Sequence, residues 1–268
     1  MMNVRRNDAI VMTQAAAALH SSSELLAPGS EALIDITIFV SCYNEAEFIV
    51  DTLDSIVAAF AQTELSFEII VIDDVSRDNS PELVETYIAR HPELRIVLRR
   101  NGLNRGLAQN YVDGAFLGKG RYYRLICGDN AEPVDTIVAV LKEVGKADML
   151  LPYYVTAEGK SLFRRLLSGA YSRLVNLISG NSIHYYNGLA IHSRYNIMRW
   201  HPTTRGFGFQ AEIVCMLLAE GASYREVAVR TVELKGGKSR ALTVKNWLSV
   251  THTLVTIVMR RLSNWVYR

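Results

Sequence analysis

The chain has 268 residues, of which 49% are hydrophobic and 21% are charged, and its formal net charge is +2. This length and composition allow one substantial buried core with a smaller appended region, which excludes a disordered tail or a scaffold without a core. The small net charge, with no basic arm or recognition motif, excludes nucleic acid as an expected partner. Cys42, Cys127 and Cys215 lie far apart without metal-type spacing, which favours reduced thiols in a reducing cytosol.

The first 33 residues hold an alanine run at 15–18 and serines at 21–23, but not the charged, apolar and cleavage regions of a signal peptide. We therefore expect a mobile extension over residues 1–33. A main domain over 34–242 and a C-terminal amphipathic helix over 243–268 complete the expected organisation.

Apolar runs that end in polar turns alternate with segments of helical spacing along the chain. This rhythm predicts an α/β fold with a parallel sheet, right-handed crossovers and helices on both faces. The expected strands lie at 36–45, 67–73, 95–101, 121–130 and 147–154, and the expected helices among them at 46–61, 104–118 and 132–145.

The run FEIIVIDDVSRDN at 67–79 is the most informative, because an apolar run typical of a strand buried on both faces ends abruptly in the adjacent carboxylates of Asp73 and Asp74. Open α/β sheets bind ligands at the carboxyl ends of their strands, so we expect a nucleotide there. The alternative is an acidic turn that caps the next helix ahead of Pro81. The recurrence of polar turns after the other strands favours the binding site.

Five motifs follow one another along the chain: SCYNE at 41–45, IDDVSRDNS at 72–80, NRGLAQN at 104–110, GDNAEP at 128–133 and GFGFQAE at 206–212. In this order they resemble the family 2 glycosyltransferases of the GT-A fold, and most of all the polyprenyl-phosphate group that contains dolichol-phosphate mannose synthase. The resemblance implies a GT-A (Rossmann-like), mostly parallel sheet sandwiched by helices, with amphipathic helices towards the C-terminus.

The resemblance also implies a nucleotide diphosphate sugar as donor. The family positions that hold the nucleoside carry over to Tyr43, Glu45, Asp73 and Asp74. Arg105 and Gly106 follow the third strand, where a guanidinium and a helix N-terminus can approach the donor. A packed aromatic is the alternative for Tyr43, and a solvated loop arginine is the alternative for Arg105.

The metal motif departs from the family pattern. Relatives usually carry Asp-x-Asp after the fourth strand to bind Mg²⁺ or Mn²⁺, whereas this chain has Cys127, Gly128 and Asp129. A thiol is a poor ligand for a hard cation, so Asp129 is the expected metal ligand and catalytic carboxylate, together with phosphates, waters and Glu132. The alternative is a helix-start cap ahead of Pro133.

The late helix carries Gln210 and Glu212 in place of the Glu-Asp pair that serves as base in relatives with sugar-hydroxyl acceptors. An acceptor that is already an anionic phosphate needs no general base, so we assign both residues to positioning. Glu212 as a plain helix-start carboxylate is the alternative.

The segment LKGGKSRALT at 234–243 resembles the family's phosphate-binding loop, with a basic surface turn as the alternative. The residues expected to bind phosphate are Lys235, Lys238, Ser239 and Arg240. In the stretch 183–194, His184 and Asn187 are candidates for the acceptor side, although a lone histidine on a strand is more often a core residue.

Residues 161–180 and 244–268 place apolar side chains at helical spacing beside arginines, which is typical of helices lying in an anionic membrane interface. The apolar run from Trp247 to Met259 is too short and too polar to predict a spanning helix. The alternative is packing on the core or in an interface between two copies of the chain.

The resemblance and these features together imply an inverting hexosyltransferase that uses Mg²⁺ or Mn²⁺, transfers a hexose from a nucleotide diphosphate sugar to a polyprenyl phosphate and sits peripherally on the cytoplasmic face of the membrane. A family 2 enzyme that extends a cell-surface or capsular glycan is the first alternative. A nucleotide-sugar-binding protein without turnover is the second.

Overall fold

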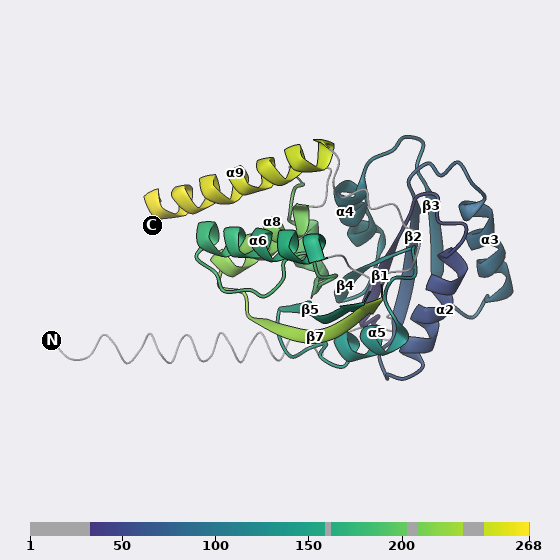
Figure 1. Ribbon diagram of the computed structural model, residues 1–268. Helices are drawn as coiled ribbons and strands as arrows, with labels where there is room; N and C mark the ends of the chain where they lie inside the picture. The colour runs from purple at the N-terminus through teal and green to yellow at the C-terminus, as the bar shows by residue number, and fades with distance from the viewer. Residues whose placement is uncertain (1–32, 159–161, 203–207, 233–243, 268) are drawn as a thin grey trace, which may run out of the picture. The chain divides into compact units, whose positions relative to one another are not determined.

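The computed structural model describes residues 33–158, 162–202, 208–232 and 244–267 (Figure 1). Residues 1–32 of the expected extension and the whole basic segment at 234–243 lie outside the described residues. Ile34–Arg268 forms one compact unit. The expected division into regions 1–33, 34–242 and 243–268 stays a prediction.

Seven strands of the described part of the chain form one mixed sheet in the order β3-β2-β1-β4-β6-β5-β7. The strands are β1 (Ile36–Cys42), β2 (Phe67–Asp73), β3 (Ile96–Arg100), β4 (Tyr122–Cys127), β5 (Met149–Glu158), β6 (Ile191–Ser193) and β7 (Tyr224–Val232). The helices are α2 (Ile49–Phe60), α3 (Ser80–Arg90), α4 (Leu107–Leu117), α5 (Val134–Leu141), α6 (Leu162–Ser179), α7 (Arg194–Met198), α8 (Phe209–Ala219) and α9 (Val244–Val266).

The predicted, mostly parallel α/β sheet is confirmed. β1 pairs in parallel with β2 and β4, β2 with β3, and β5 with β7. β6 runs antiparallel to both β4 and β5. The carboxyl ends of β1, β2 and β4 therefore meet at one edge of the sheet.

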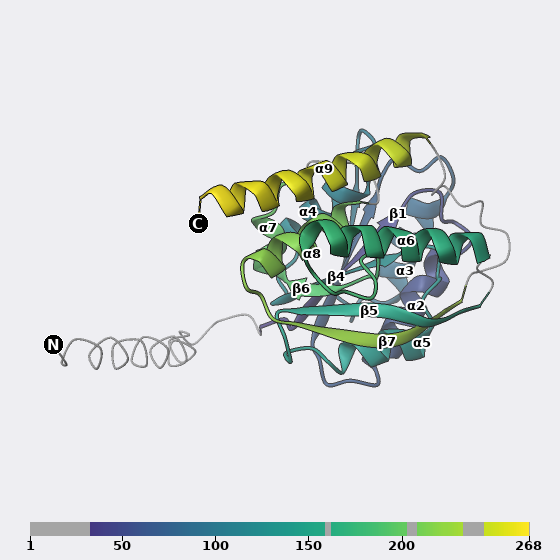
Figure 2. The ribbon, with the colours of Figure 1, turned by 60° about the vertical axis from the view of Figure 1, so that its left-hand side comes forward.

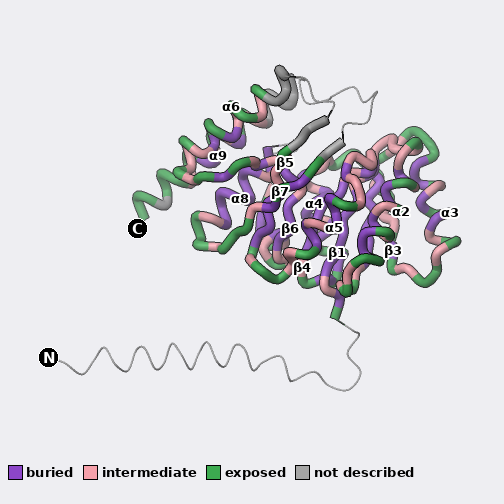
Figure 3. The backbone as a smooth tube through the Cα atoms, turned by 60° about the horizontal axis from the view of Figure 1, so that its bottom comes forward, coloured by how far each residue is buried: buried purple, intermediate pink, exposed green. Residues whose placement is uncertain are grey.

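Two hydrophobic clusters cover the two faces of the sheet, because successive side chains of a strand point to opposite faces. In β1, Ile36, Ile38 and Val40 belong to the cluster formed with α2, α3 and α5, whereas Phe39 belongs to the cluster formed with α4, α7 and α8. Figure 3 shows the central strands as largely buried. Each buried Ile contributes roughly 1.5–3 kcal/mol of transfer free energy.

α6 and α9 pack against each other, and α9 also packs on α8. Both ribbon views show α6 and α9 side by side, with the C-terminal end of α9 extending beyond α8 (Figures 1 and 2). Arg261 of α9 donates to the carbonyl oxygens of Leu177 (3.3 Å) and Ile178 (2.5 Å) at the end of α6. A Cβ on Gly208 would clash with Thr253, so α9 lies directly against the start of α8.

Candidate active site

The polar loops expected to bind the donor come together at the carboxyl edge of the sheet. Cys42 is the register partner of Asp73, and Ser41 is that of Cys127. A non-glycine residue with positive φ follows each of these three strands, namely Asn44 (58°), Val75 (69°) and Asn130 (50°). Such backbone conformations cost about 1–3 kcal/mol each and cluster at functional sites, so their grouping here favours a site at this edge.

The loop after β1 is held by the loop after β2. Asn44 N donates to Ser76 Oγ at 2.9 Å, Arg77 N donates to Asn44 Oδ1 at 2.7 Å, and Glu45 N donates to Ser80 Oγ at 2.9 Å. Tyr43 and Glu45, predicted to bind the nucleoside, thus belong to a preorganised loop pair, where both are half-buried.

The two adjacent aspartates have different surroundings. Asp74 is buried, and its Oδ1 accepts from Asn101 Nδ2 (2.9 Å) and Arg105 N (2.8 Å), while its Oδ2 accepts from Gly106 N (2.9 Å). Asp73 is buried too, but its carboxylate accepts only long bonds of 3.3 and 3.4 Å from Ser76 N among the bonds described. Asp74 therefore organises the loop ahead of α4, and Asp73 retains more capacity to accept from a ligand.

Arg105 and Gly106 begin the segment that leads into α4. Arg105 Nε lies 3.1 Å from Asp113 Oδ2, and its side chain is 41% exposed. Gly106 precedes α4 with a φ of 79°, a conformation that glycine adopts without strain. The amide groups of Arg105 and Gly106 thus donate to Asp74, and the Arg105 guanidinium is directed at Asp113 in this structure.

Cys127 and Asp129 follow β4. Burial, reinforced by the nearby charge of Asp129, raises the pKa of the Cys127 thiol, which keeps it a neutral and poor ligand. Burial also raises the pKa of Asp129, whose Oδ1 accepts from Ala131 N at 3.3 Å. Among the described residues no group of three His, Cys, Asp or Glu side chains could hold a metal. The donor set at Asp129 is compatible with a divalent cation whose other ligands are donor phosphates and water.

Glu132, considered as a second carboxylate for the metal, instead pairs with Arg124. Arg124 Nη2 donates to Glu132 Oε1 at 2.9 Å, and the arginine is completely buried. Arg124 was missed in the sequence, although an arginine inside the apolar run YYRLIC is itself a signal. Asn101, which links Asp74 to Asn110, was missed as well.

Gln210 at the start of α8 is brought together with Asn187. In the amide orientation that satisfies its hydrogen bonds, Gln210 donates to the carbonyl oxygens of Gly188 (2.8 Å) and Asn187 (3.2 Å). The buried Oδ1 of Asn187 has no hydrogen-bond partner among the described residues, so it is a ready acceptor for a ligand donor. Glu212 is buried, and Trp200 Nε1 donates to its Oε1 at 3.4 Å.

His184 lies apart from this group. Its side chain is 67% exposed, its Nδ1 is 2.7 Å from Glu226 Oε2, and its ring stacks on Tyr153 at a centroid distance of 4.8 Å. The side chains of Lys235, Lys238, Ser239 and Arg240 lie outside the described residues. Their role in binding phosphate stays a prediction.

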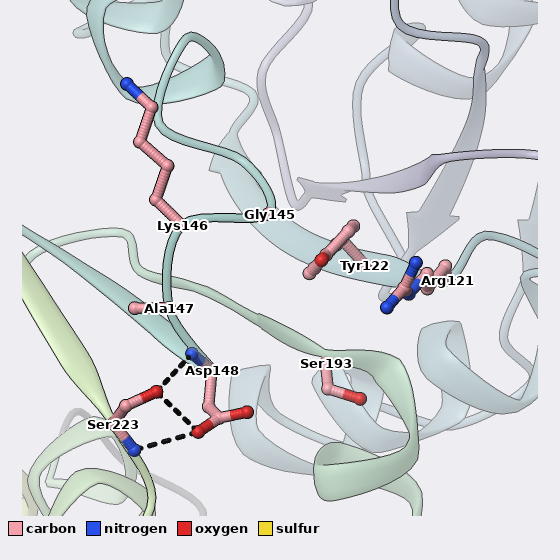
Figure 4. A pocket seen from close by; sticks show the side chains of 8 residues that line it. All are labelled: Arg121, Tyr122, Gly145, Lys146, Ala147, Asp148, Ser193 and Ser223. Atoms are coloured by element: carbon pink, nitrogen blue, oxygen red, sulfur yellow. Dashed lines mark hydrogen bonds between the residues drawn. The ribbon is translucent and has the colours of Figure 1, made fainter. Parts of the chain in front are cut away.

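The described residues also line two cavities. One, of about 340 Å³, lies at the amino end of β4 beside Arg121, Tyr122 and Ser193 (Figure 4). The carboxylate of Asp148, the acidic residue that lines this cavity, accepts hydrogen bonds from the backbone amide and the hydroxyl of Ser223. The other, of about 330 Å³, lies between α6, α8 and α9. Its lining includes Glu212, Cys215, Ile257, Arg260 and Trp265.

An open α/β sheet with hydrogen-bonded polar loops and an aspartate pair at its carboxyl edge is typical of α/β enzymes that bind a ligand at this edge. The model of the glycosyl transferase family 2 matches residues 37–203, more than half of the chain, and the chain therefore belongs to glycosyltransferase family 2.

Relatives and solved structures agree with this family. A dolichyl-phosphate beta-glucosyltransferase of Dictyostelium discoideum is 24% identical over 76% of this chain and 68% of that protein. Another, from Trichomonas vaginalis, is 30% identical over 40% of this chain, and the match spans only 33% of its length. Both are named glucosyltransferases rather than mannose synthases. A mannosyltransferase of Pyrobaculum calidifontis, solved with GDP-Man and Mn²⁺, covers 90% of this chain and 73% of its own, with a TM-score of 0.61 at 19% identity. This last likeness shows the fold.

Proposed function

We propose that the protein transfers a hexose from a nucleotide diphosphate sugar to a polyprenyl phosphate, with inversion at the anomeric carbon. The observation that carries this proposal is the chemistry at the start of α8. The Gln210 amide is engaged with two backbone carbonyls, and Glu212 is buried beside Trp200. Neither is arranged as an exposed general base, and a phosphate acceptor, already anionic, needs none.

The donor is expected at the carboxyl edge of the sheet. Asp73 would accept from the nucleoside, and the loop organised by Asp74 would line the pocket. A Mg²⁺ or Mn²⁺ ion held by Asp129 would neutralise the diphosphate as it leaves. The remaining contribution of the chain is positioning, because in-line displacement needs the acceptor oxygen behind the anomeric carbon and little else.

The transfer is tested by nucleotide release from purified protein with Mg²⁺ or Mn²⁺, a panel of UDP and GDP sugars and a short polyprenyl phosphate. UDP-glucose is the first donor to try, given the names of the two relatives. We expect release that requires the lipid phosphate, is absent with the unphosphorylated polyprenol, and is abolished by Asp129→Ala. Release with a glycan acceptor alone would replace this proposal by glycan extension, and donor binding without release would favour a protein without turnover.

The same proposal includes peripheral contact with the membrane through α6 and α9. No described helix is long and apolar enough to cross a bilayer. Leu166 and Leu177 of α6 and Met259, Leu262 and Trp265 of α9 are all more than half exposed. Exposed apolar groups on two adjacent helices are typical of an interfacial surface.

Membrane contact is tested by co-sedimentation with vesicles that contain anionic lipid. Leu262→Ser with Trp265→Ser should reduce the bound fraction severalfold, because it removes apolar area that would enter the interface. Phe116→Ser is the matched control, since Phe116 is 63% exposed on α4. Equal binding of the three proteins would refute this contact, and dimerisation that the double variant abolishes would assign the surface to a second copy.

A further inference from the structure

The side chain of Arg124, in the middle of β4, is completely buried, which is rare for arginine. Burying an ion pair costs desolvation free energy, which the attraction between the two charges often does not recover. Apolar residues of similar volume commonly replace such pairs without loss of stability. Arg124 Nη1 and Glu132 Oε2 are moreover buried without a hydrogen-bond partner among the described residues. Stability alone is therefore a weak reason for this pair.

The two bonds of the Arg124 guanidinium join two loops that are far apart in the sequence. Its Nη2 donates to Glu132 Oε1 at 2.9 Å, three residues beyond Asp129 in the loop that leads into α5. Its Nε donates to the carbonyl oxygen of Leu189 at 3.1 Å, in the loop that leads into β6. One rigid, planar group thus holds both loops at once.

The second loop continues to the acceptor side. Gly188 and Asn187, which precede Leu189, accept the two bonds from Gln210. Gly188 is also pressed against the backbone of Pro152, and a Cβ there would clash with the Pro152 carbonyl. The loop therefore has little freedom to move independently of β5 and α8.

We propose that Arg124 is a positioning residue that couples the Asp129 loop (residues 128–133) to the acceptor-side loop (residues 187–190). Through this link, the position of the Asp129 loop affects the positions of Asn187 and Gln210. Because coupling is reciprocal, the positions of these two residues affect the Asp129 loop to the same extent. The proposal rests on the transfer reaction of the family and not on the identity of the acceptor.

The test compares Arg124→Met, Glu132→Gln and their combination with wild type and with Arg194→Met. Arg194 is the matched control, because its guanidinium also donates to buried backbone, at Gly120 and Ala115, away from both loops. The readouts are the melting temperature, amide hydrogen exchange of the ligand-free proteins, and kcat and KM with the donor that the release assay identifies.

Each single variant should melt about 10 °C lower, because a buried charge loses its partner, and the double variant should recover most of this loss. The double variant should nevertheless exchange amides at least tenfold faster in both loops. Its kcat should fall about 10- to 100-fold with little change in the donor KM. Arg194→Met should lower the melting temperature without faster exchange in either loop.

If the double variant regains wild-type amide exchange and kcat along with its melting temperature, the proposal is overturned and Arg124 is a structural residue. Faster exchange in only one loop would also overturn it, because no coupling would exist. The exchange measurement uses neither donor nor acceptor, so failure of the polyprenyl phosphate assay and failure of this proposal are distinguishable.

Discussion

The separate roles of Asp73 and Asp74 can be tested by replacing each with asparagine. Asn at position 74 can keep its carbonyl oxygen towards Asn101 and Arg105 N, but its amide nitrogen then faces Gly106 N–H. One charge-assisted bond, worth about 1.5–3 kcal/mol, is lost, and a buried N–H is left unsatisfied at a further cost of about 1–3 kcal/mol. We expect Asp74→Asn to lower the free energy of unfolding by about 3 kcal/mol.

For a chain of this size that loss lowers the melting temperature by about 10 °C. Asp73→Asn should cost under about 1 kcal/mol, because the bonds of 3.3 and 3.4 Å from Ser76 N are long. It should instead weaken binding of the donor nucleotide about tenfold, the value of one hydrogen bond to a ligand. Urea unfolding gives the stabilities, and calorimetry with UDP and GDP in the presence of Mn²⁺ gives the affinities.

The opposite pattern would refute this assignment. If Asp74→Asn unfolds like wild type and loses nucleotide affinity, Asp74 contacts the donor directly and its three described bonds are incidental. If Asp73→Asn destabilises the protein as much as Asp74→Asn, the number and length of the described hydrogen bonds to the two carboxylates do not determine what each contributes to the free energy of unfolding.

Three further predictions concern single positions. Burial lowers the pKa of His192 to about 4, so the unfolded chain binds a proton that the folded chain does not between about pH 6.5 and pH 4, and stability falls as the pH drops through that window. In urea unfolding, His192→Leu should reduce the difference in the free energy of unfolding between pH 7 and pH 4 by about 3 kcal/mol. The same difference in variant and wild type would contradict a buried neutral imidazole. Gly188→Ala should cost about 1–3 kcal/mol, since its Cβ would clash with the Pro152 carbonyl, and unaltered urea unfolding would mean that the loop yields freely. Cys127→Asp should lower the melting temperature without metal, because a buried carboxylate joins Asp129, and Mn²⁺ should restore it; no response to Mn²⁺ would argue against a cation here.

Much of the fold could be predicted because β1 and β2 are mostly apolar and almost wholly buried, as is typical of strands covered on both faces. β7 was not anticipated. Its sequence, YREVAVRTV, mixes charged and apolar residues because the strand lies at the end of the sheet. The antiparallel direction of β6 follows from its pairing with β4 and β5, which a three-residue strand does not reveal in sequence.

The site was predictable only where its residues follow strands directly. Asp73, Asp74 and Asp129 could be placed at one edge because parallel strands end together. The link from Arg124 to Leu189 crosses 65 positions and uses a backbone carbonyl, which carries no residue type for a sequence pattern to detect. The bond from Asn101 to Asp74 is hidden for a similar reason, since it depends on where a loop folds back.

Local hydrogen bonding separates the carboxylates near the site into two groups. Asp74 is engaged by three donors and Glu132 by a buried guanidinium, so each has a structural partner. Asp73 and Asp129 accept only bonds of 3.3 Å or longer among those described. A buried carboxylate with weak protein partners is costly unless a ligand supplies stronger ones.

This imbalance indicates where a ligand would bind. Asp73 ends β2 and Asp129 follows β4, and β1 lies between these two strands. A nucleoside bound at Asp73 would extend its diphosphate across the end of β1 towards Asp129, where a cation can balance the phosphate charge. We therefore expect donor and metal to bind cooperatively, each raising the affinity for the other, because the cation and the diphosphate would contact each other directly.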